Sequence, residues 1–152
     1  MNRSSPVPST CNRGSGISIN FHSTERTSLD REGDEIIERY GQAMDDYLLH
    51  VGGTEAWNLV ARANAYVETS APWTLQKDGA VEHLDTVLAA LARSVSRITV
   101  MAAPFMPSKT QEVWQALGLP GTVQEATWDF LGTPAVGGNS VVKPKPIFPK
   151  PE

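Results

Sequence analysis

The residues best suited to chemistry lie in the stretch SAPWTLQKDG, from Ser70 to Gly79. Trp73 follows directly after Pro72, and Lys77 comes four residues later. An exposed aromatic ring beside a cation is typical of single-stranded RNA recognition, because bases stack on the ring and phosphates pair with the cation. Further cations that could serve such a surface are Arg62, Arg93, Arg97, Lys143, Lys145 and Lys150. RNA binding is therefore one hypothesis for this chain.

The residue types alone favour a structural role for the same side chains. Tryptophan is highly buried on average, so Trp73 is expected to cap one end of a helical core. Lys77 and the pair Arg93 and Arg97 are most simply a solvated face. The choice between the two interpretations depends on the elements that position Trp73.

The sequence contains no recognisable catalytic or metal-binding pattern. The three histidines, His22, His50 and His83, are scattered, and no pair has ligand spacing together with a third donor. Asp45 and Asp46 are adjacent, so they point to different parts of a helix surface and do not form a working pair. Neither a Ser–His–Asp arrangement nor a GxxxxGK phosphate loop is present. We therefore predict no catalytic residue, metal ligand or cofactor in this chain.

The composition limits the class of protein. With 152 residues, of which 40% are hydrophobic, the chain is long enough for one compact domain with a core. The net charge of −4 argues against a strongly basic nucleic-acid-binding protein, and DNA is not an expected partner. The single cysteine, Cys11, excludes an internal disulfide and fits a reducing compartment. No apolar run could span a membrane and no secretory signal is recognisable, so we expect a cytoplasmic protein without a membrane partner.

The N-terminal half is predicted to contain a leader and two helices. Residues 1–34 are rich in Ser, Arg, Pro and Gly, so we predict a disordered leader. Apolar residues at helical spacing predict a helix from Glu35 to His50, ended by the following VGG. A second helix is predicted to run from Thr54, its N-cap, to Pro72. Its expected inward face consists of Trp57, Val60, Asn64 and Val67, with Asn64 as a buried amide.

The strongest apolar pattern predicts a third helix over residues 80–103. A stripe at alternating spacings of four and three is expected to be buried in a bundle. This stripe consists of Leu84, Leu88, Leu91, Val95, Ile98 and Ala102. A fourth helix is predicted to start at a capping box of Ser108 and Gln111 and to end at Gly118.

These patterns predict an all-α protein, an antiparallel bundle of about four helices over residues 35–131. Residues 132–152, which contain several prolines and lysines, are predicted to form an irregular, extended tail that packs on the bundle. The candidate anchors of this C-terminal part are Trp128, Phe130, Ile147 and Phe148.

Several segments resemble the anticodon-binding domain of bacterial methionyl-tRNA synthetases, which are class I aminoacyl-tRNA synthetases. The segments are ARANAYVETSAPWTLQKD, VLAALARSVSRITVMAAPFMP, EVWQALGL and VVKPKPIFP, and the resemblance covers roughly residues 38–152. It implies a helical bundle whose partner is the anticodon loop of methionine tRNA. It also implies that Trp73 packs against anticodon bases, with Pro72 shaping the turn. Whole enzymes of this family join methionine to tRNA with ATP and magnesium.

The chain departs from this family in several ways. The HIGH-like and KMSKS motifs, the nucleotide-binding catalytic domain and the zinc-knuckle cysteines do not appear, and ATP and magnesium would belong to that catalytic domain. An earlier helix that supplies an asparagine and an arginine in the family has no counterpart either. We therefore expect a fragment or split part of a methionine–tRNA ligase that is inactive alone, with a separate catalytic domain as one expected partner.

The missing helix has a physical consequence. A bundle that lacks one helix exposes the apolar face which that helix would cover, and such faces associate. We therefore expect a chain that is marginally stable or self-associates. The alternative function is that of a non-catalytic helical module that docks a partner protein, with Trp73 buried.

Overall fold

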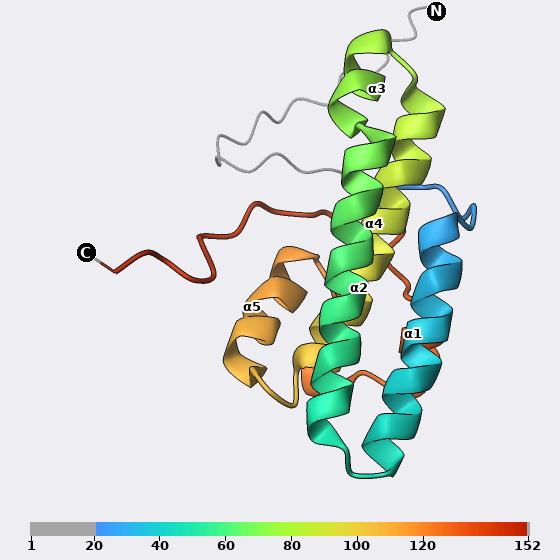
Figure 1. Cartoon of the computed structure of the whole chain (residues 1–152). Coiled ribbons are helices and arrows are strands. Elements are labelled where there is room, and N and C mark those ends of the chain that lie inside the picture. The colour runs from blue at the N-terminus through green and yellow to red at the C-terminus, as the bar shows by residue number, and fades with distance from the viewer. Residues whose placement is uncertain (1–20, 152) are drawn as a thin grey trace, which may run out of the picture.

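The computed structural model describes residues 21–151, and helices dominate this range (Figure 1). The helices are α1 (Ser28–Asp45), α2 (Leu49–Ser70), α3 (Pro72–Asp78), α4 (Val81–Ala102), α5 (Pro107–Ala116), the 3-10 helix η1 (Val123–Glu125) and α6 (Trp128–Gly132). The predicted all-α bundle is confirmed, and its four main helices correspond to α1, α2, α4 and α5. The short helices α3 and α6 were not predicted as separate elements. Residues 1–20 of the predicted leader lie outside the described residues.

Helix α1 begins at Ser28 rather than at Glu35, because a capping box starts it earlier. The Thr27 hydroxyl accepts a hydrogen bond from the backbone N–H of Asp30, and the Asp30 carboxylate accepts one from the backbone N–H of Thr27. Phe21 and Leu29 are buried, so the described part of the predicted leader belongs to the fold. The first turns of α1 are mostly polar, which is why apolar periodicity did not reveal them.

The predicted role of the VGG stretch is wrong. Helix α1 ends at Asp45 and the chain turns at Tyr47, which has a positive φ of 59°, so that both glycines lie inside α2. A Cβ atom on Gly52 would lie 2.8 Å from the Met44 sulfur. The glycine therefore permits a close approach between α1 and α2 and does not end a helix.

Helix α4 lies at the centre of the bundle, between two hydrophobic clusters. One cluster joins α1 and α2 to α4 and includes Leu59 and Met101. The hydroxyl of Tyr40 donates a hydrogen bond of 3.1 Å to the Met101 carbonyl within it. The other cluster joins α4 to α5 and the C-terminal segment, and includes Ala89 and Trp114. The two clusters fix α1, α2 and α5 around α4.

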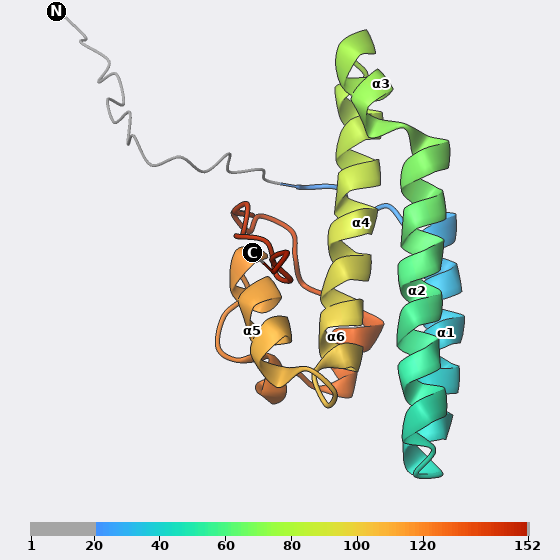
Figure 2. The same ribbon diagram turned by 60° about the vertical axis from the view of Figure 1, so that its left-hand side comes forward.

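The predicted apolar stripe of α4 is not its most buried face. Leu84, Leu88, Leu91, Val95 and Ile98 are only half-buried, although Ala102 at the end of the stripe is buried. Figure 2 shows α5 on one side of α4 and α2 on the other, with α1 behind α2. No described helix covers α4 between α5 and α2, which explains the residual exposure of the stripe.

Backbone contacts attach the C-terminal segment to the bundle. The N–H of Gly138 donates to the carbonyl of Phe21, and the N–H of Val142 donates to the carbonyl of Ala116, both at 2.8 Å. Of the predicted anchors, Phe130 packs against Trp114 with ring centroids 5.0 Å apart. Trp128 and Phe148 are exposed and Ile147 is half-buried, whereas Val136, which was not predicted, is buried. Within residues 21–151, no helix is both long and apolar enough to cross a membrane.

Candidate nucleic-acid interface

The candidate interface is the short helix α3, which stands at one end of the α2–α4 pair (Figure 1). Ala71 links α2 to α3 and has a left-handed conformation with φ 42° and ψ 60°. Such a conformation is strained for a residue that has a Cβ atom. Pro72 then occupies the first helical position, where a residue without an N–H fits. The break that the sequence predicted at Pro72 therefore turns the chain abruptly before Trp73.

Trp73 is 52% exposed, so it is not the buried end-cap that its residue type suggested. Lys77 follows one helical turn later and is exposed as well. Residues four apart lie on the same side of a helix, so the indole ring and the ammonium group belong to one surface. Lys77 forms no ion pair with any described residue. This surface offers a ring for stacking and a nearby cation.

Arg62 lies apart from the α3 surface. It is on α2, and eight residues of helix separate it from Ser70, which corresponds to about 12 Å along the helix axis. Its guanidinium forms an ion pair of 3.3 Å with Glu32 on α1, and the Arg62 and Glu32 side chains are 64% and 43% exposed. The structure therefore brings together Pro72, Trp73 and Lys77 but not Arg62.

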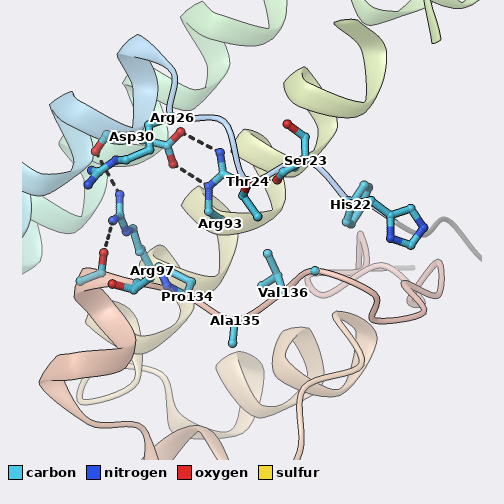
Figure 3. Close-up of a pocket in the computed structure, with 15 residues that line it drawn as sticks. His22, Ser23, Thr24, Arg26, Asp30, Arg93, Arg97, Pro134, Ala135 and Val136 are labelled. Atoms are coloured by element: carbon cyan, nitrogen blue, oxygen red, sulfur yellow. Dashed lines mark hydrogen bonds and ion pairs between the residues drawn. The ribbon is translucent and has the colours of Figure 1, made fainter. Parts of the chain in front are cut away.

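Arg93 and Arg97 are buried or half-buried, so the predicted solvated arginine pair is wrong. Figure 3 shows the Arg93 guanidinium directed at Asp30 near the start of α1, and the Arg97 guanidinium between the start of α1 and the end of α6. Arg93 donates two hydrogen bonds of 2.8 Å to the Asp30 carboxylate. Arg97 donates to Asp34 at 2.9 Å and to the carbonyls of Asp30, Leu131 and Gly132. These cations hold the domain together and are not available to a phosphate.

The electrostatics of this cluster follow from burial and pairing. Burial alone would raise the pKa of Asp30, but hydrogen bonds from Arg93 and Thr27 outweigh it and lower that pKa. Hydrogen bonding to Asp30 raises the pKa of Arg93. Burial lowers the pKa of Arg97, against the opposing effect of Asp34. A cavity of about 420 Å³ adjoins the cluster, and the guanidinium groups of Arg93 and Arg97 in its lining are already engaged in these structural bonds.

Sequence reasoning missed one further surface, on α2. The face expected to point inward, Trp57, Val60, Asn64 and Val67, is exposed or half-buried, and Asn64 is exposed and not a buried amide. The buried residues of α2 are instead Gly52, Ala56, Leu59 and Ala63, which are also three or four apart. Small residues give a weak periodic signal, so the larger side chains dominated the prediction.

The fold and the exposed α3 surface define a helical domain suited to binding. No group of three or more acidic, histidine or cysteine side chains among residues 21–151 is placed to hold a metal ion. The sequence matches the family of anticodon-binding domains of tRNA ligases over residues 29–137, and this chain belongs to that family.

The proteins that resemble this chain include methionine–tRNA ligases. The methionine–tRNA ligase of Brucella suis biovar 1 is 31% identical over 130 residues, which are 86% of this chain and 25% of that protein. That of Lactiplantibacillus plantarum is 35% identical over 118 residues, or 75% of this chain and 17% of that protein. The apo structure of Mycobacterium tuberculosis methionyl-tRNA synthetase superimposes with a TM-score of 0.75 at 20% identity, over 89% of this chain and 28% of that chain. This last likeness establishes the fold. The chain thus spans about a quarter or less of these curated relatives.

Proposed function

We propose that this domain binds the anticodon loop of methionine tRNA and that Trp73 provides a stacking surface for an anticodon base. The observation that carries the proposal is the exposure of Trp73 at the strained turn into α3. The left-handed conformation of Ala71 costs about 1–3 kcal/mol, and strain of this kind gathers at ligand-binding sites, which favours a ligand for the exposed ring that this turn presents. Membership of the anticodon-binding family supports RNA as that ligand, and the names of the relatives support methionine tRNA.

The neighbouring residues have distinct roles in this proposal. Pro72 fixes the start of α3 and so the direction of the indole ring. Lys77 contacts a backbone phosphate one helical turn from the stacked base. Arg62 contributes a second phosphate contact by exchanging its partner Glu32 for RNA. That exchange costs little, since an exposed ion pair contributes about 0–1 kcal/mol.

Aminoacylation itself is proposed to need the part of the relatives that this chain does not match. That part would use ATP and magnesium, whereas this domain contributes recognition of the tRNA and binds no cofactor. A catalytic domain is therefore a proposed partner, and the cytoplasm is the proposed site of action.

The proposal is tested with two RNA hairpins, the anticodon stem-loop of methionine tRNA and the same hairpin with a changed anticodon. Fluorescence anisotropy gives the affinity of the wild-type protein, Trp73→Ala and Trp128→Ala. Trp128 is the matched control, because it is exposed to a similar extent and lies on α6. Loss of one stacked base costs about 1–3 kcal/mol, so Trp73→Ala should weaken binding of the first hairpin by roughly five- to 150-fold. Equal binding of both hairpins, unchanged by Trp73→Ala, would contradict the proposal.

A further inference from the structure

We propose that residues 143–150, KPKPIFPK, form a second RNA-binding surface on this chain, which we name the lysine segment. Its ligand is the phosphate backbone of the RNA that α3 binds, and its contacts are independent of the base sequence. The inference rests on the proposed function, because both surfaces hold one RNA. The two are separable by experiment, since contacts to phosphates respond to salt and contacts to bases respond to the anticodon sequence.

The lysine segment carries most of the unpaired positive charge in the part of the chain that the structure describes. Residues 21–151 contain eleven lysines and arginines, and six of these form ion pairs. The five that form none are Arg31, Lys77, Lys143, Lys145 and Lys150. No aspartate or glutamate occurs in the sequence from residue 130 to residue 151. A polyanion would therefore meet cations without neighbouring carboxylates along this part of an acidic chain.

A proline follows each exposed residue of the segment that is suited to binding RNA. The pairs are Lys143–Pro144, Lys145–Pro146, Phe148–Pro149 and Lys150–Pro151. A residue before proline is held in an extended conformation, and proline fixes its own φ. Ordering such a chain on a ligand therefore costs less entropy than ordering a flexible one. An extended proline-rich chain rises about 3.1 Å per residue, so Lys143 and Lys145 are about 6 Å apart, a spacing comparable with that of neighbouring phosphates on one RNA strand.

The bundle holds the start of the lysine segment and leaves the rest of it free. The N–H of Val142 donates a hydrogen bond of 2.8 Å to the Ala116 carbonyl at the end of α5. Val141 packs against the hydrophobic cluster that contains Ala89 and Trp114. Residues 143–150 form no hydrogen bond with any residue that the structure describes, and the chain leaves the bundle beside α5 (Figure 1). The lysines are therefore available to a ligand.

The start of the lysine segment lies near the end of α4 that carries α3. Ala89, in the cluster on which Val141 packs, is eight residues after Val81, the first residue of α4, which corresponds to about 12 Å along the helix axis. Helix α3 joins this same end of α4 directly. The eight residues from Val142 to Lys150 span at most about 25–30 Å when extended. The lysines can therefore contact an RNA whose loop rests on α3.

The α3 surface has few cations of its own, so RNA binding there calls for further phosphate contacts. Lys77 is the one cation of α3, and Asp78 follows it directly. Arg62 is the other cation proposed for this RNA, and it is paired with Glu32. One phosphate contact strengthens binding only about five- to eightfold at 0.1 M salt. Three further lysine contacts would together strengthen binding by roughly 100- to 500-fold.

The aromatic residue of the segment favours RNA over an acidic protein as the ligand. Phe148 is 69% exposed and lies between Lys145 and Lys150 in the sequence. A ring between cations can stack on an unpaired base while the cations hold phosphates on either side. An acidic protein surface would satisfy the lysines but would leave the ring among polar groups. We therefore argue for RNA, and an acidic protein partner is the alternative that the experiment separates from it.

Fluorescence anisotropy of the full chain with the methionine hairpin and the changed hairpin, measured over a range of salt concentrations, tests the inference. The double variant Lys143→Gln/Lys145→Gln should weaken both hairpins by the same factor, at least about fivefold at 0.1 M salt. It should also reduce the slope of log K against log salt by about 1.4–1.8, because two phosphate contacts are lost. Lys143→Arg/Lys145→Arg keeps both charges and should bind as the wild type does.

The matched control is Arg39→Gln/Lys109→Gln. It lowers the net charge by the same amount, but its two cations are already paired with Glu55 and Glu112. Both the affinity and the salt slope of this control should stay close to those of the wild type. Circular dichroism checks that every variant is folded.

Comparison with Trp73→Ala separates this inference from the proposed function. If Lys143→Gln/Lys145→Gln changes neither affinity nor salt slope while Trp73→Ala still weakens the methionine hairpin, the inference is overturned alone, and an acidic protein becomes the ligand to test. If the lysine variant weakens both hairpins while Trp73→Ala changes neither, the lysine segment binds RNA and anticodon recognition fails. Equal losses in the lysine variant and in Arg39→Gln/Lys109→Gln overturn the inference, because net charge alone then explains the binding.

Discussion

Replacement of Arg97 by alanine should destabilise the domain more than any change to its surface charges. The Arg97 side chain is 2% exposed and its guanidinium group donates four hydrogen bonds. Three of these end on the backbone carbonyls of Asp30, Leu131 and Gly132, and the fourth ends on the Asp34 carboxylate. One side chain thus connects α4 to the start of α1 and to the end of α6.

The magnitude follows from the partners that would remain. Backbone carbonyls cannot be replaced by mutation, so Arg97→Ala removes the guanidinium donor from all three of them. A buried group without its partner costs about 1–3 kcal/mol, and truncation of a buried charged network costs about 3–5 kcal/mol in total. Unfolding of about 130 residues has an entropy of roughly 0.27 kcal/mol/K, so the Tm should fall by about 10–20 °C. An apolar replacement, Arg97→Met, restores volume but not the donors, and it should still cost about 1–3 kcal/mol.

Urea and thermal unfolding followed by circular dichroism measure these changes, with the wild type and all variants at the same protein concentration. Arg39→Ala is the control, because Arg39 forms an exposed ion pair of 3.1 Å with Glu55. Its loss should cost at most about 1 kcal/mol. A cost below 1 kcal/mol for Arg97→Ala, or equal costs for the two variants, would refute the assignment of Arg97 as a structural cation.

Two further predictions concern acid stability and the C-terminal segment. Because the pKa of Asp30 is lower in the fold than its unfolded value of about 3.9, Asp30 stabilises the domain fully above about pH 4–5 and loses this effect as the pH falls through the native pKa. Urea midpoints from pH 7 to pH 3 should therefore fall less steeply for Asp30→Asn than for the wild type, and parallel slopes would argue against this. Gly118→Ala should cost about 2–3 kcal/mol, because φ is 68° and its Cβ would lie 2.7 Å from the Ser140 carbonyl oxygen. Gly79→Ala, with φ 72° but open space, should cost only about 1 kcal/mol, and equal costs would mean that the C-terminal segment does not pack there.

The helices themselves could be predicted because their signals are local. The break at Pro72 and the end near Gly118 were correctly placed, since proline and glycine restrict or free the backbone at their own position. The start of α1 at Ser28 was missed, although Thr27 and Asp30 carry a capping box that apolar periodicity does not detect. VGG was misread because a glycine that ends a helix and one that admits a neighbouring helix look alike in sequence. The structure distinguishes the two cases, because the Met44 sulfur lies where a Cβ atom of residue 52 would be.

The candidate site was predictable to a smaller extent. The α3 surface could be proposed because Pro72, Trp73 and Lys77 are close in sequence, so that one local turn positions them all. The partners of Arg93 could not be predicted, since its acceptor Asp30 is 63 residues away in the sequence. A long-range pair of this kind has no signature in spacing, and a lone arginine is usually solvated. We therefore predicted from their charge that Arg93 and Arg97 lie on the surface.

The apolar stripe of α4 is the most conspicuous pattern in the sequence, yet it did not identify the buried face of this helix. Periodicity identifies which residues share a face but not which of several faces is buried. In a central helix, one face packs on α1 and α2 and another on α5, and these faces use small or polar residues such as Ala90, Ser94 and Arg97. The leucines lie toward the remaining face, between α2 and α5, and are half-buried there, with Leu88 still packed against the cluster that contains Trp114.

Large apolar side chains that stay partly exposed on that face contribute less to the stability of the domain than buried ones. Full burial of a leucine side chain stabilises a fold by about 1.5–3 kcal/mol, and a half-buried leucine contributes only part of this. The stripe keeps five half-buried apolar residues, three of them leucines. A face of this kind is explained if it is covered in the working protein. Trp73 is on α3, beyond the end of this stripe, so Trp57 and Trp73 belong to different surfaces.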